Sequence, residues 1–179
     1  PEGNSDCYAV FRPCGENEKA GKIKVGLGRV LKGDSLPLDQ YTWRVLAFGK
    51  AYEDRLDIPD RDLRYRKTLN TVNGRQVMGF FDHADITVTN IWLDGVGQAA
   101  CAYHACGDAE RGNFYANQLD AMAIDRDIQG VRCRAFPYAA NAAGGYDWVL
   151  RDRGFISVAA WYIFAKNGFN PMTLENSTP

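Results

Sequence analysis

The sequence lacks a surplus of charge of either sign, a long apolar run and an even set of cysteines. Its 179 residues include 21 basic and 22 acidic side chains, which leaves a formal net charge of −1. This balance removes the general attraction that draws a protein to nucleic acid or to an anionic membrane surface. The uncharged stretch 156–165 is far shorter than the roughly 20 apolar residues that cross a bilayer. We therefore expect no nucleic-acid partner and no membrane partner.

Cysteine usage bears on the cellular setting. The five cysteines stand at positions 7, 14, 101, 106 and 133. An odd number cannot form a fully paired disulfide framework, and the density is low for a secreted scaffold. Together with the lack of a secretory signal, this favours a cytoplasmic location over a secreted one. The chain starts with Pro1 rather than Met, which indicates a processed product or an excerpt.

Length and composition predict one domain. A chain of this size corresponds to a single domain and can bury a core without disulfide or metal staples. The apolar share of 46% and the charged share of 24% are ordinary for a globular protein. We expect a single domain over residues 1–179, with loose polar tails at 1–6 and 171–179.

Four stretches predict β-strands. Apolar residues alternate with lysine or glycine in 22–27, the period of a half-buried strand. Val77–Phe81 and Ile86–Leu93 are rich in β-branched and aromatic residues. The Asn-Gly pair at 73–74 is a hairpin signal. Val131–Phe136 is expected to form the last strand.

Four further stretches predict helices, namely Leu38–Tyr52, Phe114–Ile128, Tyr146–Arg151 and Ser157–Asn167. The small apolar residues of Gln98–Cys106 fit a helix or a strand equally well. Helices and strands mixed along one chain favour the α+β class, with helices packed on a sheet.

The segment from Cys101 to Cys106 contains His104 between its two thiols. Thiolate and imidazole groups can share a zinc ion, or can act as a nucleophile and its base. The alternative interpretation is a pair of small buried thiols in a core element. Because few other donors exist to complete a metal site, we expect no bound metal.

His83 follows Asp82 and precedes Asp85 by two positions. A neighbouring carboxylate can orient an imidazole for proton transfer. The alternative is an exposed turn between strands, where these residue types are common.

Aromatic residues gather near the C-terminal end, including Tyr146, Trp148, Trp161, Tyr162 and Phe164. Aromatic rings at helical spacing fill a core or line a groove. The same segment is therefore a candidate surface for a protein partner.

The order of elements over about residues 108–170 resembles the back half of a domain of the GCN5-related N-acetyltransferase (GNAT) superfamily. A loop with Arg111-Gly112-Asn113 precedes a long helix, a strand and a helix that ends in Gly168-Phe169. A second Gly-Phe pair, Gly154-Phe155, is preceded by Tyr146. The resemblance implies a mixed, mostly antiparallel central sheet flanked by helices.

The resemblance further implies an enzyme that moves an acetyl-like group from acyl-CoA to the amine of a small molecule or protein. Backbone N–H groups of Arg111, Gly112 and Asn113 would hold the CoA pyrophosphate. Tyr162 would protonate the leaving thiolate, with Tyr146 as the alternate donor.

The base that deprotonates the amine would be Asp85, with Asp82 and Asp94 as further candidates. Phe114 stands where the family carries a small residue, which favours the alternative of a non-catalytic interaction protein of a larger assembly. A hydrolase or transferase that uses Cys101 or Cys106 with His104 or His83 is the third possibility.

Overall fold

The computed structural model describes residues 2–30, 36–71, 74–141, 146, 153–173 and 175–176. The helices in these residues are α1 Glu2–Phe11, α2 Asn17–Val30, α3 Leu38–Phe48, α4 Asp57–Arg61, α5 Leu93–Ala105, α6 Ala109–Met122 and α7 Ile156–Lys166, with a 3-10 helix η1 at Lys50–Arg55. The strands are β1 Arg66–Asn70, β2 Gln76–Phe80, β3 Ile124–Ile128, β4 Val131–Ala135, β5 Phe169–Asn170 and β6 Glu175–Asn176. None of the described helices is long and apolar enough to cross a membrane.

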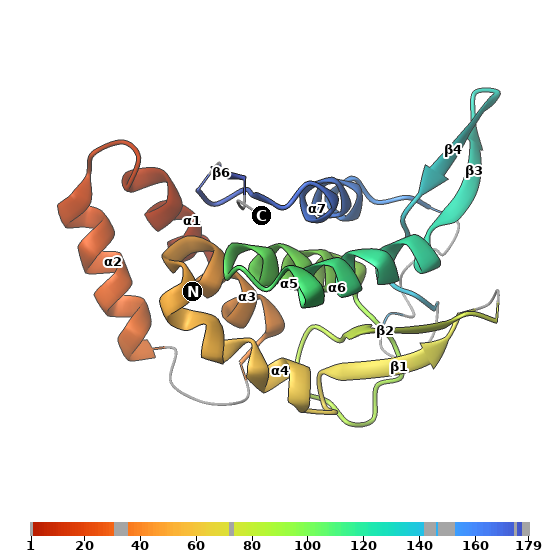
Figure 1. The fold of residues 1–179 in the computed structure, drawn as a ribbon, viewed down its shortest axis with the longest axis horizontal. Coiled ribbons are helices and arrows are strands. Elements are labelled where there is room, and N and C mark those ends of the chain that lie inside the picture. Colours follow the sequence, from red (N-terminus) through yellow and green to blue (C-terminus); the bar gives the residue numbers. More distant parts are fainter. Residues whose placement is uncertain are drawn as a thin grey trace.

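Helix α5 occupies the centre of the molecule (Figure 1). It packs against α3 on one side, α6 alongside and α7 on the other side. Every residue from Leu93 to Tyr103 is buried. The small residues of this helix allow the close packing, since a Cβ on Gly97 would lie 2.6 Å from the Cβ of Trp161. The segment that fits either a helix or a strand is therefore the central helix.

The strands form antiparallel pairs around this helical centre, so the α+β class is confirmed. β1 pairs with β2, β3 with β4, and β5 with β6. Each pair is a separate two-stranded sheet among the described residues. The predicted strands at Val77–Phe81 and Val131–Phe136 appear as β2 and β4. A helix, rather than a sheet, holds the central position in the described part of the chain.

The predicted strand at 22–27 is wrong, because this segment belongs to α2. The alternation conceals a helical face in which Ala20, Ile23 and Leu27 follow one another at steps of three and four. Ala20 and Ile23 pack in a cluster with Tyr8 and Phe48, and Leu27 is also buried, while Val25 remains 56% exposed. The burial of the α2 face against α1 and α3 thus selects the helix.

The predicted strand at Ile86–Leu93 is also wrong, since this segment is irregular as far as Trp92 and α5 begins at Leu93. Asn90 explains why a ladder does not form there. Its side chain accepts a hydrogen bond from the backbone N–H of Ile91 and donates to the backbone oxygen of Asn141. A side chain that bonds to the backbone in this way competes with strand pairing.

The helix predicted for Phe114–Ile128 is displaced along the chain. Helix α6 begins earlier, at Ala109, and ends at Met122, and β3 follows at once. Gln129 and Gly130 both adopt positive φ angles, 54° and 80°, which are the values of the two-residue turns that match the twist of a hairpin. These residues therefore close a β3–β4 hairpin that the sequence pattern left unrecognised.

Both ends of the described chain carry structure where loose tails are predicted. Glu2–Phe11 forms α1, and Tyr8 packs edge-on against Phe48 at 4.4 Å between ring centroids. Near the other end, β5 pairs with β6. Of the helix predicted at Tyr146–Arg151, only Tyr146 lies within the described residues, and it is not helical.

A pair of glycine substitutions tests this packing. In Gly79→Ala, the new Cβ would lie 2.5 Å from Val96 Cγ2 and 2.6 Å from Ile91 Cγ2, and overpacking of this kind costs about 1–3 kcal/mol. The matched change Gly26→Ala places a methyl group on α2 with nothing within 4 Å. It should raise the free energy of unfolding by up to about 1 kcal/mol, because alanine favours a helix. Urea denaturation measures both; destabilisation by Gly26→Ala would argue against helix α2.

Candidate functional site

Tyr162, the first predicted proton donor, lies on α7 beside α6. Its hydroxyl donates a hydrogen bond to Asp120 Oδ1 at 2.8 Å. Lys166 and Arg134 also pair with Asp120, at 2.7 Å and 3.2 Å. Burial and the charge of Asp120 raise the pKa of Tyr162. The hydroxyl is therefore engaged in a network that joins α7 to α6.

Arg111, Gly112 and Asn113 lie in the first turns of α6 and do not form a loop. Asp108 caps this helix, accepting the backbone N–H of Arg111 at 3.0 Å. Its backbone oxygen accepts the N–H of Gly112, also at 3.0 Å. A carboxylate thus already occupies the end of the helix where the resemblance places a pyrophosphate.

The Arg111 side chain links α4, α5 and α6. Its guanidinium donates to Asp108 Oδ2 at 2.5 Å and to Asp57 Oδ1 at 3.0 Å. It also lies 4.4 Å from the ring centroid of Tyr103, a cation–π geometry. The ring of Tyr103 stacks on Tyr115, whose hydroxyl donates to Asp60. Arg111 is therefore engaged with carboxylates of the chain itself.

Asp85, the predicted base, accepts the N–H and the hydroxyl of Thr87 at its Oδ1, both at 2.7 Å. These hydrogen bonds lower its pKa. A carboxylate with a lowered pKa is a weaker proton acceptor. Asp85 is therefore held by Thr87, and its charge interacts with His83.

Tyr146, the alternate donor, is buried in a second aromatic cluster with Phe81 and Tyr138. Its ring lies 5.0 Å from Phe81 and 5.4 Å from Tyr138, between centroids. Burial first, and the charge of Asp82 second, raise the pKa of Tyr146. The neighbouring Phe81 ring lies 4.6 Å from the His83 ring, and His83 Nδ1 is hydrogen-bonded to Asp82. The Asp82–His83 pair thus borders this cluster.

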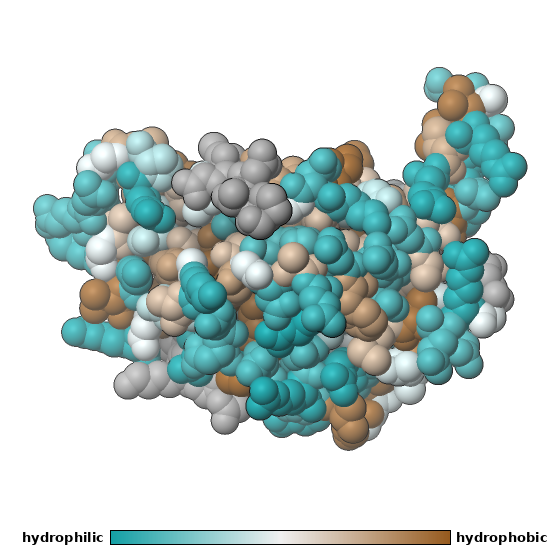
Figure 2. All heavy atoms as spheres, in the orientation of Figure 1, coloured by the Kyte–Doolittle hydropathy of each residue, from teal (hydrophilic) through white to brown (hydrophobic). Residues whose placement is uncertain are grey.

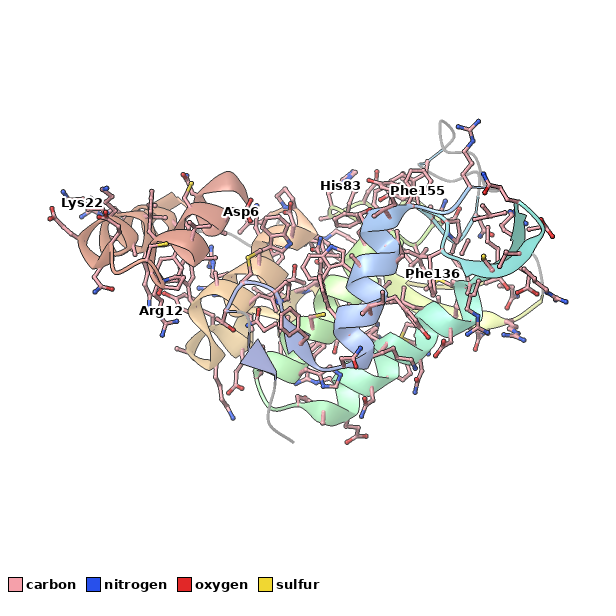
Figure 3. The ribbon with its side chains drawn as sticks, turned by 90° about the horizontal axis from the view of Figure 1, so that it is seen from above. Asp6, Arg12, Lys22, His83, Phe136 and Phe155 are labelled. Atoms are coloured by element: carbon pink, nitrogen blue, oxygen red, sulfur yellow. The ribbon has the colours of Figure 1, made fainter. Side chains whose placement is uncertain are left out.

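The aromatic cluster extends to the start of α7. Tyr138 lies 5.3 Å from Phe155 and 6.4 Å from Trp92, between centroids. Figure 3 shows His83 and Phe155 near one another at the N-terminal end of α7. The charges of Asp94 and Asp82 both raise the pKa of Tyr138, after burial. We give the name acidic aromatic site to a set of residues made up of Phe81, Asp82, His83, Trp92, Asp94, Tyr138, Tyr146, Phe155 and Ser157.

Asp94 is the most unusual group of this site. It is only 4% exposed, in the first turn of α5. A helix N-terminus favours the carboxylate form, yet burial outweighs this and raises the pKa of Asp94. Ser157 Oγ donates to its Oδ2 at 3.2 Å, and the hydrogen bonds from Ser157 and Trp92 lower the pKa less than burial raises it. The carboxyl is thus held toward its protonated form.

Access to Asp94 follows from the position of Ser157. Ser157 is exposed to solvent although its hydroxyl reaches the buried carboxyl. Asp94 therefore lies one side chain below the surface. Sequence reasoning had included Asp94 among three bases, but its burial, which sets its protonation state, depends on the packing of α5 and α7.

The cysteine segment forms part of the core. Cys101 and Cys106 are 1% and 5% exposed, and burial raises their pKa values to about 12 and about 11. Burial lowers the pKa of His104, whose ring packs against Gly112. These thiols are therefore poor nucleophiles at neutral pH. In the described part of the chain, no group of three or more His, Cys, Asp or Glu side chains is arranged to hold a metal ion.

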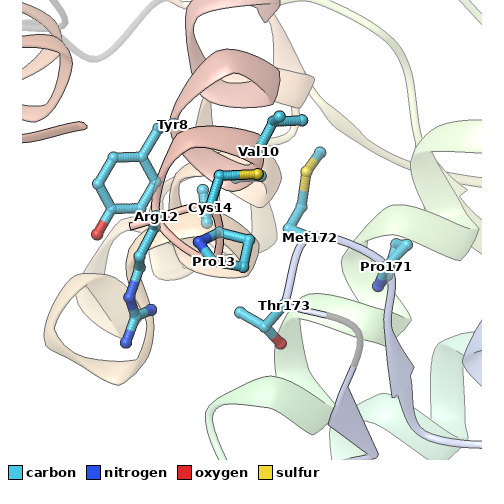
Figure 4. Close-up of a pocket in the computed structure, with 10 residues that line it drawn as sticks. Tyr8, Val10, Arg12, Pro13, Cys14, Pro171, Met172 and Thr173 are labelled. Carbon is cyan, nitrogen blue, oxygen red and sulfur yellow. The ribbon is translucent and has the colours of Figure 1, made fainter. Parts of the chain in front are cut away.

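A groove of about 520 Å³ lies between α1 and the segment after β5 (Figure 4). Asp94 is not among the residues that line it. Val10, Pro13, Pro171 and Met172 give it an apolar wall, and Arg12 lies at its margin. Among its lining residues within the described ranges, none carries a carboxylate or an imidazole. The groove therefore offers no acid–base pair, in contrast to the acidic aromatic site.

No family model, no curated protein and no solved structure matches the chain. The chemistry of the site therefore rests on the residues themselves.

Removing the Arg111 side chain tests its structural role. Arg111→Ala should lower the free energy of unfolding by about 1–2 kcal/mol, because it leaves three carboxylates together and loses charged hydrogen bonds, discounted for solvent screening. The loss should shrink at high salt. Arg132→Ala, which breaks a fully exposed pair with Asp125, should leave the urea midpoint unchanged. Equal effects of both changes would contradict the role of Arg111 in linking the three helices.

A second test concerns the protonation of Asp94. Its folded pKa is raised above 3.8, the model value, so the folded chain holds a proton that the unfolded chain releases. The stability from that proton is complete below the unfolded pKa and is lost as the pH rises to the folded pKa. Asp94→Asn cannot ionise, so its stability relative to wild type should increase from about pH 4 to pH 7, by at most about 1.4 kcal/mol per pH unit. Urea denaturation at several pH values measures this; a pH-independent difference would show that Asp94 titrates normally.

Proposed function

We propose that the acidic aromatic site belongs to an acid–base enzyme that acts on a neutral, hydroxyl-rich substrate, most simply the glycosidic bond of a sugar. The observation that carries the proposal is the carboxyl of Asp94, which burial under aromatic rings holds toward its protonated form. A carboxylic acid whose pKa is raised by burial is suited to protonate a leaving oxygen. Asp94 is therefore assigned as the general acid.

The second catalytic group is the Asp82–His83 pair. Asp82 orients the imidazole through its hydrogen bond to Nδ1, which leaves Nε2 of the exposed His83 to accept a proton from water. A protonated carboxyl and a separate base are the two groups that a glycosidase uses to cleave its substrate with water. In this scheme Asp94 donates its proton to the departing oxygen while His83 takes a proton from the attacking water.

The choice of substrate class follows from the charges and rings of the site. The negative charge of Asp82 acts on Tyr138, which disfavours an anionic substrate such as a nucleotide or a phosphate ester. Trp92, Tyr138 and Phe155 offer flat apolar faces. The indole N–H of Trp92 interacts with the side chains of Asp94 and Tyr138. Rings with a polar tip suit a molecule that is apolar on its faces and hydroxylated at its edges.

The acyl-CoA N-acyltransferase function stays a prediction from the sequence resemblance. Its intended cofactor residues, Arg111, Gly112 and Asn113, are helical and face carboxylates of the chain. Its intended donor, Tyr162, is bonded to Asp120. None of these contacts favours acetyl-CoA, so we place the catalytic site at Asp94 instead.

We also infer that the C-terminal part of the chain contacts a protein partner, as its aromatic and apolar content predicts. Helix α7 is apolar around its whole circumference, but only Val158 and Ala165 on it are buried. A helix of this kind is normally covered on all sides.

The enzymatic proposal predicts that Asp94→Asn lowers the turnover of aryl glycosides by about 10²–10⁴-fold, the usual contribution of a general acid. The loss should be much smaller for a dinitrophenyl leaving group, which departs without a proton. Wild-type activity should fall on the alkaline side as Asp94 ionises above 3.8, and this limb should be absent from Asp94→Asn.

Asp125→Asn is the matched control, since Asp125 lies on β3, pairs with Arg132 outside the site, and should keep full turnover. A panel of p-nitrophenyl glycosides and one dinitrophenyl glycoside provides the measurement. Turnover that Asp94→Asn leaves intact would refute the assignment of the acid. An equal loss for both leaving groups would show that Asp94 acts in some other way.

A further inference from the structure

One face of α7 points away from the rest of the molecule. The side chains of Val158 and Ala165 face inward onto α5 and α6. At 100° per residue, the opposite face carries Ile156, Ala160 and Ile163. Ile156 is 90% exposed and Ile163 is 55% exposed. Two large branched side chains thus flank a small one on an uncovered helix face.

This outer face is complementary to itself. Antiparallel packing of two such helices, with a two-fold axis between Ala159 and Ala160, brings Ile156 of one chain opposite Ile163 of the other. The alanines at the axis allow the backbones to approach, and the isoleucines fill the space at either end. An interface that uses the same patch on both chains closes as a dimer. The helix dipoles of the two chains also oppose one another in this arrangement.

The β3–β4 hairpin enlarges the same surface. In Figure 1 it rises beyond the layer of α7, and Figure 2 shows it standing away from the body with apolar atoms among polar ones. Ile128 and Val131, beside its turn, are 57% and 61% exposed. An isolated two-stranded hairpin is at best marginally stable in water. A second chain seated on α7 would lie against this arm and cover its tip.

We propose that a second copy of this chain covers the outer face of α7, so that two chains form a dimer about a two-fold axis at Ala159 and Ala160. The proposal rests on the inferred protein partner of the C-terminal part and identifies that partner. One helix crossing buries less than the roughly 800 Å² per chain of a standard interface. The two hairpin arms, each laid along the other chain, supply the remainder.

The first test is the mass of the purified chain in solution, by analytical ultracentrifugation. Wild type should be a dimer at about 100 µM, above the micromolar range in which interfaces of standard size still associate. Ile163→Asp should weaken association by at least about 100-fold, because the new charge would be buried against Ile156 of the other chain. The matched control is Val25→Asp, a branched residue on α2 with 56% exposure, which should leave the dimer intact.

The second test fixes the geometry by crosslinking. In a chain whose exposed Cys7 and Cys14 and half-buried Cys133 are changed to serine, Ile156→Cys and Ile163→Cys are made separately. A thiol crosslinker about 8–10 Å long, the spacing of packed helices, should join a mixture of the two variants. Each variant alone should crosslink at least about tenfold less, since antiparallel packing sets like positions apart.

A monomer at this concentration would overturn the proposal. So would equal crosslinking of the mixture and the single variants. Circular dichroism of Ile163→Asp should match that of wild type, since the side chain is exposed in one chain. The monomeric variant should retain the turnover of aryl glycosides, because Ile163 lies outside the acidic aromatic site. Failure of the dimer therefore leaves the enzymatic assignment standing, and loss of turnover in Asp94→Asn leaves the dimer standing.

Discussion

Complete burial of helix α5 is the constraint on which the other elements depend. A helix can be covered on every side only if its neighbours approach closely, and Gly95 and Gly97 provide that approach. A Cβ at Gly95 would lie 2.6 Å from both Leu38 and Trp92, so α3 and the segment before α5 could not keep their positions. The polar side chains of this buried helix must then find hydrogen-bond partners inside the protein. Gln98 meets this requirement by accepting the hydroxyl of Thr42 at 3.0 Å.

The same burial creates the chemistry of Asp94. A carboxyl in the first turn of a surface helix would be ionised and stabilised by the helix dipole. Because α5 lies at the centre and α7 covers its start, Asp94 is removed from water, and its carboxyl interacts with Ser157 and Trp92. The adjacent rings of Trp92 and Tyr138 keep water away from one side of it. The burial of α5 thus stabilises the core and also raises the pKa of Asp94.

The other charged clusters have a different physical role. Asp120 gathers Tyr162, Arg134 and Lys166, and so ties α7 and the hairpin to α6. Arg111 gathers Asp57 and Asp108, and so ties α4 to α6. Both clusters lie between elements and pair opposite charges. They hold the layers around α5 in place, whereas within the described residues no cation contributes to the pKa of Asp94.

Part of this could be read from the sequence. The α+β class, β2, β4, α3 and α7 follow from local patterns whose period matches the element. The sequence also names Asp82, His83, Asp94 and Tyr146 as groups suited to proton transfer, because carboxyl, imidazole and phenol have that chemistry wherever they lie. Only the tertiary structure decides that these groups come together and that Tyr162 bonds to Asp120 instead. It also decides that 22–27 is a helix and 124–128 a strand. Alternation over five or six residues fits either element, and burial against distant residues selects between them. A pKa likewise depends on desolvation by side chains that are remote in sequence, such as those of α7 over the start of α5.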